Sequence, residues 1–139
     1  MRRNGTAGER ARLLREQIRY YDDRAPEYED LWYRRGRHDL GPDFNTRWFE
    51  ETAIVEAAVD AAASEGSVLE IGCGSGLWTR RLAGSASRYV ALDSSRTMLE
   101  LNRGRNDGSN TEYVLADAFD WEPSTDAQFD LIFFGFFIS

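Results

Sequence analysis

The feature that most constrains this chain is a glycine-rich turn directly after a short apolar run. The run, residues 67–71, has the length and composition of a buried parallel strand, and the turn continues as Gly72-Cys73-Gly74-Ser75-Gly76. Glycines let the backbone approach a ligand closely, and the helix N-terminus behind such a turn favours electron-rich groups. The pattern predicts a nucleotide-like ligand at the carboxyl end of a first strand. A turn whose glycines serve only packing is the alternative.

Two details of this turn narrow the choice of ligand. A dinucleotide fingerprint has glycine at the sixth position of the loop, which is Leu77 here. Glu70 places an acid at the end of the strand, where it repels a pyrophosphate and attracts a cation. S-adenosylmethionine carries an ammonium and a sulfonium and no phosphate. The turn therefore favours that cofactor over a nicotinamide dinucleotide, whose oxidoreductases are the alternative from another enzyme class.

The residues after the turn alternate between helical and strand patterns. Further strands are expected at 88–92, 111–115 and 129–134, with a helix at about 77–83 and another that begins after Ser95 as its N-cap. Such alternation predicts crossover connections and a parallel α/β sheet. Before the turn, the sequence predicts helices at 9–21, from Pro26 onward, and from a cap at Asp43 or Asn45 to about residue 64.

Two acids follow the second and third expected strands. Asp93 lies 21 residues after Gly72, a distance at which a carboxylate in such folds accepts hydrogen bonds from ribose hydroxyls (93 − 72 = 21). A helix-capping role is the alternative for Asp93, although Ser95 can take the cap. Asp117 could accept from an adenine amino group while the backbone N–H of Ala118 donates to the ring. The alternative for Asp117 is capping of its own loop.

Composition excludes several other classes of function. The formal net charge of -7 argues against a nucleic-acid partner, and the arginines at 34, 35 and 37 are interpreted mainly as a solvated helix face. Cys73 is the single cysteine, which favours a reducing compartment. We expect a soluble, cytoplasmic protein without membrane contact, because residues 1–15 have no apolar core and residues 131–138 are too few to cross a bilayer. One cysteine and one histidine, His38, make no zinc site without several carboxylates, and a surface position is the favoured interpretation of His38.

Taken together, the strings VLEIGCGSG, ALDSSRTML, YVLADAFDW and FDLIFFGFF resemble successive motifs of the class I S-adenosylmethionine-dependent methyltransferases, most closely the small-molecule members. The resemblance covers residues 67–136, and YYDDRAPEYEDLWY is similar to the variable N-terminal cap of these enzymes. It implies a Rossmann-like, doubly wound parallel sheet with the strand order 3-2-1-4, preceded by N-terminal helices. We expect residues 1–43 to form the cap and residues 44–139 a partial cofactor-binding domain.

The resemblance also implies roles for single residues. Glu70, Gly72 and Gly74 would line the methionine moiety, Asp93 would hold the ribose with Ser94 beside it, and Asp117 with Ala118 would frame the adenine. Tyr21, or its neighbours Tyr20 and Tyr28, would close over the cofactor. Gly135 and Phe136 would face the transferred methyl group, and aromatic faces such as Trp32, Tyr33 and Trp78 could hold the sulfonium. No catalytic residue is assigned.

The sequence departs from the family at its end. The family fold has seven strands, whereas this chain ends just past the fourth, so we expect a truncated chain. A fourth strand without its usual neighbour would be an unpaired apolar edge. The absent strands normally supply much of the substrate pocket, so the methyl acceptor and the oligomeric state are not assigned. The alternative function is a remnant that binds the cofactor without catalysing transfer.

Overall fold

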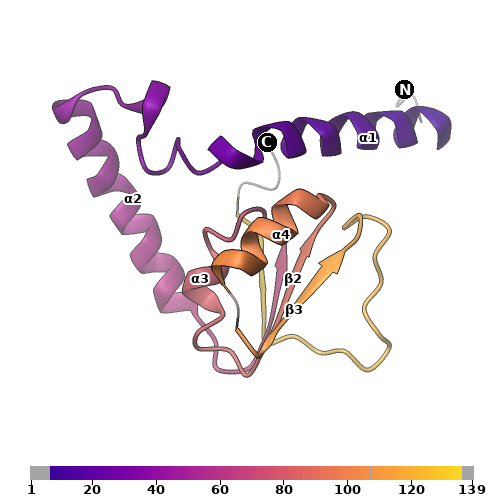
Figure 1. Ribbon diagram of the computed structural model, residues 1–139. Coiled ribbons are helices and arrows are strands. Elements are labelled where there is room, and N and C mark those ends of the chain that lie inside the picture. The colour runs from indigo at the N-terminus through magenta and orange to yellow at the C-terminus, as the bar shows by residue number, and fades with distance from the viewer. Residues whose placement is uncertain (1–6, 107, 136–139) are drawn as a thin grey trace, which may run out of the picture.

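The computed structural model describes residues 7–106 and 108–135 (Figure 1). At its centre is a parallel sheet with the order β3-β2-β1-β4. The strands are β1 (Ser67–Ile71), β2 (Arg88–Asp93), β3 (Thr111–Leu115) and β4 (Leu131–Phe133). The predicted α/β, Rossmann-like fold with strand order 3-2-1-4 is thus confirmed. Strand β4 is shorter than the predicted 129–134.

The sheet is covered differently on its two faces. On one face lie α3 (Thr79–Leu82) and α4 (Arg96–Arg105), of which α4 packs on β2 and β3, and the core there includes Val68, Tyr89, Leu82 and Leu99. The other face is crossed by the long connection between β3 and β4. Because all four strands run parallel, their carboxyl ends lie at one edge of the sheet. The loops that follow β1, β2 and β3 therefore meet at that edge.

The N-terminal part of the chain covers this carboxyl edge. Helix α1 (Ala7–Arg24) lies across the ends of the strands, and α2 (Pro42–Ala62) descends along the side of the sheet toward α3 (Figure 1). None of the side chains of α1 is buried. The expected domain boundary between residues 43 and 44 falls within the first turn of α2.

The helix predicted from Pro26 onward is wrong. The segment forms one 3-10 turn, η1 (Ala25–Glu27), and then irregular turns that end at Arg34, whose φ is 50°. Hydrogen bonds of mixed span, such as Asp30 N–H to Glu27 O at 3.0 Å and Arg35 N–H to Asp30 O at 2.9 Å, replace a continuous α-helical pattern. The tertiary contacts of Glu29 and Trp32, both buried, override the local preference for a helix.

Helix α2 also begins differently from the expectation. Its N-cap is Gly41, with no side-chain cap, so neither Asp43 nor Asn45 has the predicted role. Asn45 instead accepts a hydrogen bond from the Leu40 N–H at 3.2 Å. The arginines at 34, 35 and 37 do not form a helix face either. They lie in a turn, at the N-cap of η2 (Gly36–His38) and within η2, respectively. The guanidinium of Arg34 lies 4.0 Å from the ring centroid of Trp48.

Candidate cofactor site

The glycine turn has the left-handed backbone that its residues allow. Gly72, Gly74 and Gly76 have φ values of 67°, 52° and 98°. At Gly76 a side chain would also displace Asn106, because a Cβ there would lie 2.2 Å from Nδ2 of Asn106. The N–H groups of Gly72 and Cys73 donate to the carbonyl of Leu92 at 2.8 and 3.0 Å, which ties the turn to the end of β2. The loop is therefore held in one shape by β2 and α4.

Asp93 connects the glycine loop to the next loop. Its Oδ2 accepts from Gly74 N–H at 2.9 Å and its Oδ1 from Ser95 N–H at 2.8 Å. Burial raises the pKa of this half-buried carboxyl, and the backbone hydrogen bonds oppose that effect. Each oxygen retains acceptor capacity, so the carboxylate can also accept from hydroxyl groups. Ser95 takes the N-cap of α4, as predicted, by accepting from Met98 N–H at 3.1 Å.

Glu70 lies behind the loop in the interior of the domain. It is 1% exposed, and its Oε2 accepts from the hydroxyls of Thr79 at 2.5 Å and Tyr89 at 2.8 Å. Burial raises the pKa of this carboxyl to about 7, although the two hydrogen bonds oppose the rise. Burial is likewise the first cause that raises the pKa of Tyr89. The contact of Glu70 with the methionine moiety stays a prediction, and its shown role is to join β1, β2 and α3.

Two asparagines that were not predicted from the sequence support the loop. Asn102, fully buried on α4, donates to Gly74 O at 3.2 Å and to Thr79 Oγ1 at 2.9 Å. Asn106, one turn later, donates to Gly76 O at 3.3 Å. The signal available in the sequence was the position of Asn102, four residues after Met98 on the apolar stripe of a helix, where a polar residue needs buried partners.

The third loop brings Asp117 and Ala118 to the same edge, after β3. Asp117 Oδ1 accepts from the Phe119 N–H at 3.0 Å, so the loop-capping interpretation of Asp117 holds. Its other oxygen, Oδ2, lies 3.7 Å from Nη2 of Arg10 on α1. Ala118 is half-buried, as is Ser94 beside Asp93. Contacts of these residues with an adenosine stay predictions.

A group of tyrosines from the N-terminal segment extends to the glycine loop through one member. The rings of Tyr20 and Tyr21 are 5.5 Å apart and those of Tyr21 and Tyr28 are 6.1 Å apart, both edge to face. Tyr28 is the member that reaches the loop, since a Cβ at Gly74 would lie 3.6 Å from its ring. Burial, followed by nearby Tyr21 and Asp93, raises the pKa of the Tyr28 phenol.

The other residues expected near the transferred methyl group lie either in the core or near the end of the chain. Trp32 and Trp78 are buried and pack edge to face at 5.1 Å, as core residues do. Gly135 is close to that core, because a Cβ there would lie 2.6 Å from Nε1 of Trp78. Phe136 lies outside the described residues. His38 lies in η2, where its Nε2 is 3.3 Å from Nε of Arg37.

The model of a family described as a methyltransferase domain matches residues 68–138. This chain belongs to that methyltransferase family. The match begins at β1 and includes the glycine loop, Asp93 and Asp117. A search of curated proteins found no significant match.

Solved structures resemble this methyltransferase domain over most of its length. The complex of DhpI with SAH has 34% identity and a TM-score of 0.65, covering 88% of this chain and 52% of DhpI. The DhpI–SAM–HEP complex has 34% identity and a TM-score of 0.63, covering 94% and 52%. NodS, an N-methyltransferase from Bradyrhizobium japonicum WM9, shows the fold at 23% identity and a TM-score of 0.52, covering 60% and 42%. The chain thus spans about half the length of DhpI.

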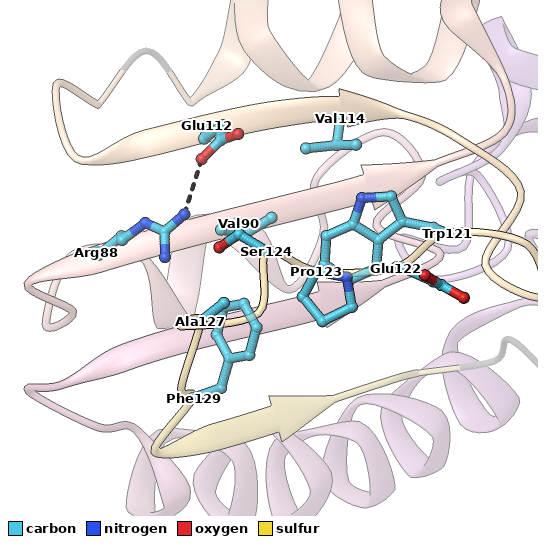
Figure 2. A pocket seen from close by; sticks show the side chains of 10 residues that line it. All are labelled: Arg88, Val90, Glu112, Val114, Trp121, Glu122, Pro123, Ser124, Ala127 and Phe129. Atoms are coloured by element: carbon cyan, nitrogen blue, oxygen red, sulfur yellow. Dashed lines mark hydrogen bonds and ion pairs between the residues drawn. The ribbon is translucent and has the colours of Figure 1, made fainter.

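The methyltransferase domain has a separate cavity on its other sheet face. About 190 Å³ in volume, it lies between β2 and β3 and the connection to β4 (Figure 2). Trp121, Pro123 and Phe129 lie over Val90 there, and Arg88 pairs with Glu112 at 3.1 Å. Its lining shares no residue with the expected cofactor contacts, so it is not the candidate site.

Among the described helices, none is long and apolar enough to cross a membrane.

Proposed function

We propose that this chain binds S-adenosylmethionine at the carboxyl edge of its sheet and serves methyl transfer to a small-molecule acceptor. The observation that carries the proposal is the left-handed glycine loop joined to Asp93 by the 2.9 Å bond from Gly74. The structures of DhpI at 34% identity, whose titles name SAM and SAH, support the choice of cofactor. Because the chain spans about half of DhpI, the activity of the whole protein is part of the proposal.

The charges at the edge fit a cationic cofactor. Glu70 lies behind the loop and Asp93 beside it, and the nearby Asp22 adds to the rise that burial causes in the pKa of the Asp93 carboxyl. Arg80, at the start of α3, is not available for a phosphate, because its Nη2 is bound by Glu29 at 2.8 Å. An acidic edge attracts an ammonium or sulfonium and repels a pyrophosphate. This balance favours S-adenosylmethionine over a nicotinamide dinucleotide.

Each part of the cofactor would be held by a different loop. Gly72 and Gly74 would accommodate the methionine moiety under the ring of Tyr28, while Asp93 would accept from the ribose hydroxyls. Asp117 and Ala118 would flank the adenine. S-adenosylmethionine supplies a methyl group activated by its sulfonium, and the protein supplies binding and orientation. Holding the acceptor in line with the methyl group can lower the barrier by about 7–11 kcal/mol, so the proposal requires no general base.

A small molecule is the acceptor that the surface chemistry favours. A formal net charge of -7 opposes tracking of a nucleic-acid backbone. Helix α1 also covers the carboxyl edge, which suits an enclosed acceptor better than a large one (Figure 1). The second candidate function is cofactor binding without transfer. Incubation with radiolabelled S-adenosylmethionine and a panel of small amines, alcohols and acids separates the two, since only the first yields labelled product.

Calorimetric titration of S-adenosylmethionine into the 139-residue chain tests the cofactor assignment. Asp93→Ala is expected to weaken binding about 100-fold, because charged hydrogen bonds are worth about 1.5–3 kcal/mol each. The matched control is Asp130→Ala, which removes a carboxylate bonded to the Ser67 N–H at 2.7 Å, at the opposite end of β1. The control should bind like the parent. Absence of binding by a folded, monodisperse parent would overturn the proposal.

A further inference from the structure

Residues 7–34 are the part of the expected N-terminal cap (1–43) that contacts the carboxyl edge, and only this part is called the cap here. Charged side chains join it to each of the three loops at that edge. Arg10 bonds Asp120 at 2.9 Å in the loop after β3. Asp22 accepts from Ser95 Oγ at 2.5 Å in the loop after β2. Glu29 contacts the glycine loop after β1. Since α1 has no buried side chain, these polar contacts are central to its docking.

Of the three links, the one made by Glu29 is the most enclosed. Its Oε1 accepts from Ser75 Oγ at 2.8 Å, from Arg80 Nη2 at 2.8 Å and from Arg105 Nη1 at 3.0 Å. The Glu29 side chain is 8% exposed, whereas the side chains of Arg10 and Asp120 are 57% and 66% exposed. Buried, charge-assisted hydrogen bonds are stronger than exposed ion pairs. Glu29 therefore anchors the cap.

The position of Glu29 also determines what lies over the loop. The preceding residue is Tyr28, whose ring lies beside Gly74. The partner of Glu29 is Ser75, which directly follows Gly74. The carboxylate of Glu29 thus holds the segment that contains Tyr28 against the glycine loop. If the bond between Glu29 and Ser75 breaks, both the ring and the loop lose a shared support.

We propose that Glu29 is a positioning residue that couples docking of the N-terminal cap to the cofactor-binding shape of the glycine loop. The inference rests on the proposed function, because it assigns the ligand of that loop as S-adenosylmethionine. Coupling of this kind is reciprocal: a ligand that orders the loop favours the docked cap, and a docked cap raises the affinity of the loop for the ligand. Glu29 itself need not touch the cofactor.

The test combines calorimetry with limited trypsin digestion, using S-adenosylhomocysteine as the probe. Helix α1 contains arginines at 12 and 19 whose cleavage reports cap release, while Arg47 on α2 is a reference site. In the parent, saturating probe should slow cleavage in α1 at least 5-fold and leave cleavage at Arg47 unchanged. Glu29→Gln should weaken probe binding at least 10-fold and abolish the slowing. Ser75→Ala, which spares the two arginine pairs, should reproduce part of both effects.

Asp60→Asn is the matched control, because it breaks an ion pair with Arg81 that joins α2 to α3 away from the loop and from residues 7–34. It should retain both the probe affinity and the protection of α1. A Glu29→Gln protein that binds the probe and protects α1 as the parent does would overturn the inference. So would equal loss of affinity in Asp60→Asn, since the effect would then follow general destabilisation. Failure of the parent to bind the probe would instead overturn the proposed function.

Discussion

The buried carboxyl of Glu70 predicts a pH dependence of stability that one substitution should remove. Its pKa is about 7 in the folded chain against an ordinary value of 4.5. Between these values the folded state holds more protons than the unfolded state, so the free energy of unfolding falls as pH rises and levels off above pH 7. The glutamine in Glu70→Gln cannot ionise, so this variant should lack the pH-dependent contribution to the free energy of unfolding.

The size of this pH effect on the free energy of unfolding follows from the part of the interval between pH 4.5 and pH 7 that can be measured. From pH 5.5 to the pKa of about 7, the contribution is about 2 kcal/mol, at about 1.36 kcal/mol for each pH unit. Glutamine keeps an oxygen that can accept from Thr79 and Tyr89, but its amide N–H groups need partners, which can cost about 1–3 kcal/mol at every pH. The informative quantity is therefore the change between two pH values, not the stability at either.

Urea unfolding of both proteins at pH 5.5 and pH 8 measures that change. The parent should lose about 2 kcal/mol more than Glu70→Gln over this range. Asp93, whose pKa is also raised, is present in both proteins, so its contribution largely cancels in the difference. An equal change in the two proteins would refute the reasoning that Glu70 is buried with a raised pKa.

Three further predictions concern the same loops. Gly76→Ala should lower the free energy of unfolding by about 1–3 kcal/mol in urea titrations, since the φ of Gly76 is 98° and Asn106 occupies the space of the new Cβ. The control Gly104→Ala, with no atom near the new Cβ, should be neutral or stabilising. Ser95→Ala should cost about 1 kcal/mol in the same assay through loss of the α4 cap, and no loss would contradict the cap assignment. If Glu70 faces the cofactor ammonium, binding near pH 7 should release a proton, and calorimetry in two buffers of different ionisation enthalpy measures it; identical apparent enthalpies would contradict that contact.

Much of the fold was predictable because its signals are local. Strands β1, β2 and β3 follow short apolar runs, and the Ser95 cap is a single-residue signal. The segment after Pro26 was not predictable in this way. Its helix is replaced by turns because Glu29 and Trp32 make contacts with residues more than 40 positions away, such as Ser75 and Trp78. No local propensity contains that information.

By itself the sequence determined the glycine turn, the acids at the ends of the first three strands and the family of the fold. These depend on backbone freedom at Gly72, Gly74 and Gly76 and on the order of local elements. Only the tertiary structure decided which polar groups meet: Glu70 with Tyr89, Asn102 with the Gly74 carbonyl, and Glu29 with Ser75. The physical reason is that a buried polar group must find a partner, and packing of the whole domain, rather than neighbours in sequence, determines which partner is within reach.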